Sequence, residues 1–168
     1  MTTLLQSAPQ IIKGFKIVVI HLGTNDLGHK REWLQFLQYK DGAISLSHVK
    51  SNLKPVNGGR FLKDYRDLLL LIRSLDPAII ILCSSILPRP YDFHWRDTVR
   101  VEWNSIIRHL AGEVRAIYLS TSNPFLKKGS LKASLFKEDG LHLTQAGVDV
   151  LISYLGDKIP KALSGLIY

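Results

Sequence analysis

The sequence predicts an α/β fold in which helices cover both sides of a parallel sheet. Three short apolar runs, rich in β-branched residues, alternate with stretches whose apolar residues recur every three or four positions. A run that is apolar throughout is typical of a strand buried on both faces, as in a parallel sheet. The alternation of strands and helices, joined by right-handed crossovers, then gives three layers.

Each apolar run is expected to form one strand. The first covers residues 15–22 (FKIVVIHL) and ends at Gly23. The second covers residues 78–86 (AIIILCSSI) after an Asp-Pro turn pair, and the third covers residues 114–120 (VRAIYLS) before the loop STSNP. The carboxyl ends of parallel strands meet at one edge of the sheet, where ligands of such folds gather.

Helices are expected at residues 59–75, 97–110 and 145–157, the last with Thr144 as its N-cap. In each stretch the apolar positions define one face that would pack on the sheet. These positions are Phe61, Leu62, Tyr65, Leu68, Leu69 and Ile72, then Val99, Val101, Trp103, Ile106, Ile107 and Leu110, then Val148, Val150, Leu151, Ile152 and Leu155.

A length of 168 residues, 46% of them hydrophobic, predicts one domain over 1–168 with a buried core. Residues 28–59 are mixed, with a helical stretch WLQFLQYK in what is otherwise loop. The apolar stretch 68–87 is interrupted by Arg73, Asp76 and Pro77, which argues against a membrane span. With no signal sequence at the amino terminus, a cytoplasmic protein is expected.

A net charge of +8 is compatible with an anionic partner such as nucleic acid, or with a soluble protein that has spare lysines. The basic residues are spread along the chain, apart from one modest cluster at Lys127, Lys128, Lys132 and Lys137. The single Cys83 excludes a disulfide framework and a cysteine-rich zinc site, and its apolar surroundings predict a buried, inert thiol. His29, His48 and His109 have no metal-site spacing.

Asp139 and His142, in KEDGLHLT, lie three residues apart around a glycine that permits a tight turn. A carboxylate at this spacing can hold one imidazole nitrogen as a donor and leave the other as a general base. The alternative is that Asp139 only caps a turn.

Asn25, in HLGTNDLG, follows the first predicted strand, where its amide could stabilise an oxyanion. An Asn-Asp turn without a catalytic role is the alternative.

Taken together, a strand that ends in GTND, a middle strand that ends in SSILPR and a closing DGLHLT resemble the SGNH (GDSL-like) hydrolase family over about residues 15–155. Gly23, Asn25 and Asp26 match the family's G-x-N-D block, and Asp139 and His142 match its D-x-x-H block. The blocks are also similar to the esterase domain of some LINE-type retrotransposon proteins.

The resemblance implies a flavodoxin-like α/β/α sandwich that hydrolyses carboxylic or acetyl esters without a metal or a cofactor. It implies that His142 is the base, Asp139 its orienting acid, and Asn25 an oxyanion donor, with Gly23 beside it in the same block. The substrate would be a small ester or an acetylated compound.

The sequence departs from the family at its beginning, because no G-D-S segment occurs among the residues before Gly23. That segment supplies the family's nucleophilic serine. Ser7 is the upstream serine, in a context unlike a strand-to-helix elbow, and Ser84 and Ser85 end a neighbouring strand that the family does not use for its nucleophile. We therefore expect an N-terminally truncated sheet that is rearranged, or completed by another chain, as in a homo-oligomer.

Two interpretations follow. The first is a truncated SGNH-type esterase domain whose activity the absent serine block puts in question. The second is a non-catalytic SGNH-like module, retroelement-derived, that associates with other molecules or with nucleic acid. The loop PRPYDFHWRD could add substrate contacts from His94, Trp95 and Arg96, or be a plain surface loop, and His21 is expected to be structural, within a strand.

Overall fold

The computed structural model describes residues 10, 12–27, 58–90 and 93–167, with the main chain alone for residues 58–60 and 93–96. Ser7, His29, His48 and the helical stretch predicted near residue 35 therefore lie outside the described residues. The described part contains a three-stranded parallel sheet with the order β1 (Ile17–Ile20), β2 (Ile80–Ser84), β3 (Ile117–Leu119). Each strand lies inside one predicted apolar run.

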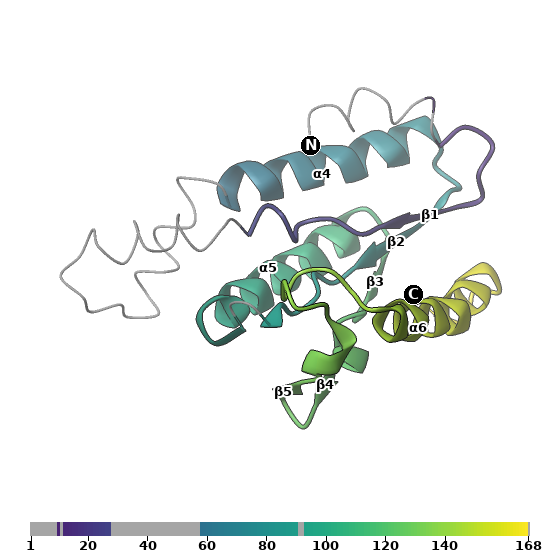
Figure 1. Cartoon of the computed structure of the whole chain (residues 1–168). Coiled ribbons are helices and arrows are strands. Elements are labelled where there is room, and N and C mark those ends of the chain that lie inside the picture. Colours follow the sequence, from purple (N-terminus) through teal and green to yellow (C-terminus); the bar gives the residue numbers. More distant parts are fainter. Residues whose placement is uncertain (1–9, 11, 28–57, 91–92, 168) are drawn as a thin grey trace.

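Helices pack on both faces of this sheet, which confirms the predicted three layers (Figure 1). The helices are α4 (Gly58–Leu75), α5 (Phe93–Glu113) and α6 (Gln145–Leu163). Successive side chains of a strand point to opposite faces. Accordingly, Ile81 and Cys83 of β2 lie in the core formed with α4 and α5, whereas Leu82 packs with Leu119 and Ala162 on the α6 side.

Two helix faces differ from their predictions. In α5, Val101 is 53% exposed, and the polar side chains of Arg100 and Asn104 are buried in its place. In α6, Ile152 is 62% exposed, while Tyr154 and Leu155 pack towards the sheet. Helix α5 also begins earlier than predicted, so the segment of His94, Trp95 and Arg96 is its first turn and not a loop. None of the described helices is long and apolar enough to cross a membrane.

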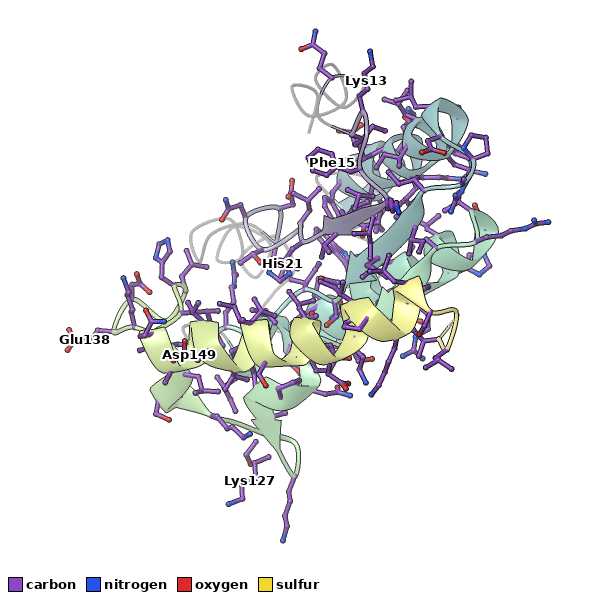
Figure 2. The ribbon with its side chains drawn as sticks, turned by 90° about the vertical axis from the view of Figure 1, so that its right-hand side faces the viewer. Lys13, Phe15, His21, Lys127, Glu138 and Asp149 are labelled. Atoms are coloured by element: carbon purple, nitrogen blue, oxygen red, sulfur yellow. The ribbon has the colours of Figure 1, made fainter. Side chains whose placement is uncertain are left out.

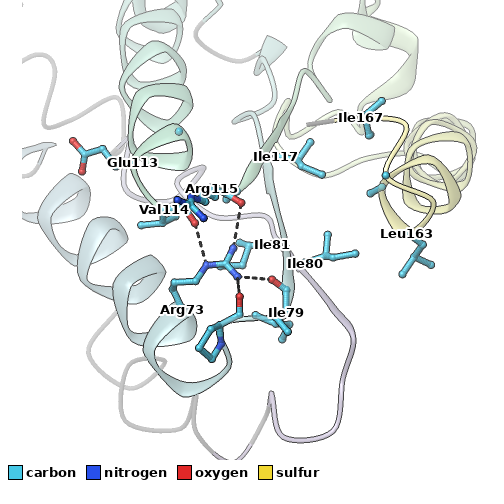
Figure 3. Close-up of a pocket in the computed structure, with 16 residues that line it drawn as sticks. Arg73, Ile79, Ile80, Ile81, Glu113, Val114, Arg115, Ile117, Leu163 and Ile167 are labelled. Carbon is cyan, nitrogen blue, oxygen red and sulfur yellow. Dashed lines mark hydrogen bonds between the residues drawn. The ribbon is translucent and has the colours of Figure 1, made fainter.

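The amino edge of the sheet contains a groove of about 1000 Å³ between the end of α5 and the end of α6 (Figure 3). The guanidinium of Arg73 donates hydrogen bonds to the carbonyls of Pro77, Ile79, Val114 and Arg115. One side chain therefore satisfies carbonyls from the turns before β2 and β3, which ties the two crossovers together. This groove is at the edge opposite to the strands' carboxyl ends.

Helices α5 and α6 end in the same motif with different residues. Arg115 and Gly165 each hold the left-handed position, with φ of 55° and 70°. The next residue along, Ala116 or Leu166, donates back to the carbonyl of Ala111 or Lys161. A side chain other than glycine costs about 1 kcal/mol or more in this conformation.

Arg115→Gly is expected to raise the free energy of unfolding by about 1 kcal/mol, because glycine removes the steric cost of the left-handed position. Gly165→Arg is its counterpart and should lower the free energy of unfolding by a similar amount. Urea unfolding followed by circular dichroism measures both. A loss of stability in Arg115→Gly would show that the arginine side chain itself contributes more than its strained backbone costs.

Candidate active site

A tight turn before α6 holds Asp139 against His142. The side-chain Oδ2 of Asp139 lies 2.7 Å from Nδ1 of His142, and Oδ1 accepts hydrogen bonds from the main-chain N–H groups of Leu141 and His142. Gly140 has φ of 64°, which explains the glycine in this motif. The turn is closed at its ends by the N–H of Lys137, which donates to the carbonyl of His142.

These contacts lower the pKa of Asp139 to about 2 from its usual 3.8, first through the hydrogen bond to the His142 ring and then through the two main-chain donors. Asp139 is therefore ionised at neutral pH and can only accept hydrogen bonds. Nδ1 must carry the proton of a neutral His142 ring, which leaves the lone pair on Nε2. Both side chains are largely exposed, and no described residue hydrogen-bonds to Nε2. This is the arrangement that a general base requires.

We expect the Asp139 carboxyl to titrate near pH 2, which ¹³C NMR of the side-chain carboxyl can measure. The folded pKa lies below the usual value, so the turn's contribution to stability is complete above about pH 4. This contribution is lost as the pH falls through 2. In His142→Ala the main hydrogen-bonding partner is gone, and the pKa of Asp139 should rise towards 3.8. A wild-type value near 3.8 would contradict the hydrogen-bonded turn.

Gly23 and Asn25 lie in the turn that follows β1. Gly23 has φ of 109°, and a Cβ there would come within 2.6 Å of Ile86 Cδ1 and 2.9 Å of Phe61 Cζ. The fold thus requires glycine for a structural reason, and a role for Gly23 at an oxyanion stays a prediction. Asn25 is exposed, and no hydrogen bond joins its side chain to a described residue. Its amide is therefore available to a ligand.

The segment after β2 connects the two halves of the candidate site. Leu87 and Leu143, the neighbour of His142, belong to one apolar cluster built around Phe125 and Phe136. Two residues beyond Leu87, the buried Arg89 donates from Nη1 to the carbonyl of Thr24 at 2.9 Å. Both the Asn25 turn and the His142 turn therefore lie at the carboxyl edge of the sheet. No hydrogen bond joins the two side chains to each other.

The serines that end β2 have different surroundings. Ser85 is fully buried, and its hydroxyl contacts the Thr121 hydroxyl at 3.0 Å and accepts from the Ser122 N–H at 2.8 Å. It therefore joins the loops after β2 and β3, and its hydroxyl has no access to a substrate. Ser84 is also buried, but its hydroxyl has no hydrogen-bond partner in the described part of the chain.

Replacing these adjacent serines by alanine should give opposite results. Ser85→Ala leaves the buried Ser122 N–H without its partner, while the Thr121 hydroxyl keeps its hydrogen bond to the main-chain carbonyl of residue 85. The variant should lower the free energy of unfolding by about 1–3 kcal/mol. Ser84→Ala removes a buried hydroxyl that has no partner, so it should be neutral or stabilise by up to about 1 kcal/mol. Urea unfolding compares the two variants, and equal losses would contradict the assigned contacts.

Sequence reasoning missed two residues that fix this edge. The side chain of Asn104 accepts from the N–H of Ile86 at 2.7 Å and donates to its carbonyl at 3.1 Å. Arg89, as described above, binds the carbonyl of Thr24. The signal for Asn104 was present, since Asp97, Arg100 and Asn104 recur at helical spacing as one polar stripe. Nothing in the sequence pattern singled out Arg89.

The remaining candidates have structural or exposed positions. Cys83 is buried as expected, and burial raises the pKa of its thiol to about 11, so the reactive thiolate is not formed at neutral pH. His21 was expected within a strand, but β1 ends at Ile20 and His21 directly follows it with an exposed side chain. Among the described residues, no three His, Cys, Asp or Glu side chains gather as a metal site would require.

The model of the GDSL-like lipase/acylhydrolase family matches residues 1–150. No curated protein matches the chain. Among solved structures, a GDSL-like lipase from Bacteroides thetaiotaomicron has a TM-score of 0.65 at 19% identity, covering 96% of this chain and 71% of that one. A protein from Streptococcus pneumonia named for platelet activating factor has a TM-score of 0.66 at 21% identity, covering 94% and 66%.

A further structure is a catalytic mutant, serine to alanine, of an acetylxylan esterase from Geobacillus stearothermophilus. Its TM-score is 0.58 at 16% identity, covering 92% of this chain and 64% of that one. At these identities the structures show a shared fold. The chain spans 66% of the length of the pneumococcal protein and 64% of the length of the esterase.

Proposed function

Because the chain belongs to the GDSL-like lipase/acylhydrolase family, we propose that it is an SGNH-type ester hydrolase domain that carries the general-base half of the catalytic machinery. The observation that supports this most is the 2.7 Å contact between Asp139 and Nδ1 of His142. An ionised, hydrogen-bonded carboxylate fixes the tautomer that makes Nε2 the base. The presence of an acetylxylan esterase among the similar structures favours a carboxylic or acetyl ester as the substrate.

In the proposed reaction His142 removes a proton at Nε2 from the attacking hydroxyl and later returns it to the leaving alcohol. Asp139 stays ionised throughout and stabilises the imidazolium that forms between these steps. The amide of Asn25 donates a hydrogen bond to the oxygen that becomes negatively charged when the ester carbonyl is attacked. These roles need neither a metal nor a cofactor.

No described residue takes the position of the attacking serine in this proposal. No G-D-S segment precedes Gly23 in the sequence. The hydroxyl of Ser85 is buried, and it hydrogen-bonds to the Thr121 hydroxyl and the Ser122 N–H. Residues 1–168 alone should therefore not form an acyl-enzyme, and His142 could only activate water. A homo-oligomer that adds a strand at the free edge of β1 would extend the sheet but not supply the serine, because each copy lacks the same segment.

A second candidate function is a non-catalytic, retroelement-derived module that associates with nucleic acid. The net charge of +8 favours it. It predicts salt-sensitive binding that does not depend on His142.

For the first candidate, purified protein is treated with a fluorophosphonate serine probe and, separately, with a nitrophenyl acetate ester. We expect no covalent labelling, because no serine is activated. Ester turnover should be slow and should fall in His142→Ala, the variant that removes the base. Labelling in the wild type that disappears in His142→Ala would reveal a serine nucleophile within this chain. It would overturn the proposal that the chain carries the base without the nucleophile. Turnover that is equal in wild type and His142→Ala would reject His142 as a base.

A further inference from the structure

We propose that the hairpin formed by β4 (Leu126–Lys127) and β5 (Ser130–Leu131) is a nucleic-acid-binding surface that contacts phosphates and does not read the base sequence. This inference rests on the second candidate function and is independent of the chemistry of His142. The surface consists of the side chains of Lys127, Lys128 and Lys132, here called the hairpin lysines.

The hairpin extends from the body of the molecule between β3 and α6 (Figure 1). Figure 2 shows Lys127 reaching outwards at the end of the molecule opposite to Lys13. Lys127 pairs with Ser130 across the hairpin, and Lys128 and Gly129 form the two-residue turn between them, with φ of 51° and 79°. Positive φ at both positions is typical of a type I′ turn, which places the lysines at a compact tip.

The base of the hairpin is fixed to the core. Leu131 packs in the apolar cluster that contains the buried Phe125. The main-chain N–H of Lys132 donates to the carbonyl of Phe125 at 2.9 Å, and its Nζ donates to the carbonyl of Pro124 at 2.8 Å. A rigid base holds the tip lysines in place, so less side-chain and backbone freedom is lost when a polyanion binds.

The charge of this region is concentrated and not compensated. Residues 123–137 contain four lysines and no acidic residue, which is half of the net charge of +8. None of the hairpin lysines forms an ion pair with a described residue, whereas Lys63, Lys158 and Lys161 each pair with an aspartate. An unpaired basic tip attracts the phosphate backbone of a nucleic acid.

Lys128 is held at a backbone position that favours asparagine or glycine. A lysine there costs about 1 kcal/mol or more. The second positive charge at the tip therefore costs local stability. Residues in such strained backbone conformations are often found at binding sites.

The side-chain chemistry favours nucleic acid over a membrane. The exposed large hydrophobic residues of the described chain all lie outside the hairpin: Phe15, Leu70, Leu75, Val101, Ile152, Leu163 and Leu166. A membrane-binding loop would be expected to insert such residues. The tip also has no aromatic or arginine side chain for base stacking or bidentate base contacts, so the lysines can serve only as point charges for phosphates.

The test measures fluorescence anisotropy of a dye-labelled single-stranded RNA and of a DNA duplex, both of random sequence, over a series of salt concentrations. We expect Lys127→Glu/Lys128→Glu to weaken binding about tenfold or more at low salt. For the single-stranded RNA, the slope of log affinity against log salt concentration should become shallower by about 0.7 for each lysine that is replaced. Lys13→Glu/Lys16→Glu is the matched control, since it makes the same change in net charge at the other end of the molecule.

A second variant, Lys127→Gln/Lys128→Asn, removes the charges with residues that suit the turn, and it should weaken binding without loss of thermal stability. Equal losses in the hairpin variant and the Lys13/Lys16 control would show binding by net charge alone and overturn the proposal. Undiminished binding in both hairpin variants would overturn it while leaving the second candidate function intact. Absence of wild-type binding at low salt would reject both. Preferential binding to phosphatidylserine vesicles would replace nucleic acid with a membrane surface.

Discussion

The candidate site depends on how one short segment, residues 86–89, is held at the carboxyl edge of the sheet. Asn104 clamps both main-chain groups of Ile86, whose side chain packs against Gly23 so closely that no Cβ fits there. Arg89 then binds the carbonyl of Thr24, and Leu87 joins the apolar cluster that contains Leu143. The Asn25 turn and the His142 turn are both built on this segment. A buried amide on α5 therefore positions the residues of two distant loops.

The two halves of an ester hydrolase, the base and the nucleophile, impose different demands on a chain. The proposed base depends on local contacts, because Asp139, Gly140 and His142 form one turn in which the carboxylate fixes the tautomer of the ring. The nucleophile half is not local, because a serine must reach that imidazole from another strand. Strand β1 is an edge of the described sheet. The carbonyl of Lys16 accepts a hydrogen bond from the N–H of Ile80. Every second residue of β1 therefore turns its main-chain N–H and carbonyl groups away from β2, towards the open side of the sheet. If the proposed function is right, a strand that carries the serine would add at this edge.

Much of the fold was predictable because three apolar runs have no alternative to burial in a parallel sheet. The D-x-x-H turn was equally accessible, since its contacts span three residues. The buried faces of the helices were harder to predict. Val101 has the hydrophobicity of a core residue, yet α5 turns Arg100 and Asn104 inwards because Ile86 needs hydrogen-bonding partners there. The helical spacing of Asp97, Arg100 and Asn104 marks a polar stripe, but the sequence does not show that the segment after β2 needs its hydrogen bonds. The spacing of the lysines in the sequence also did not predict that they lie on a hairpin that extends from the body of the molecule.

The central claim is that the His142 ring and Asn25 share one edge of the sheet. It is tested most directly by a nitroxide spin label on Asn25→Cys, since the buried Cys83 should not react. The account predicts strong paramagnetic broadening of the His142 ring resonances in NMR and little broadening of His109, which lies near the far end of α5 at the opposite edge. Equal broadening of both rings, or an unaffected His142, would contradict it.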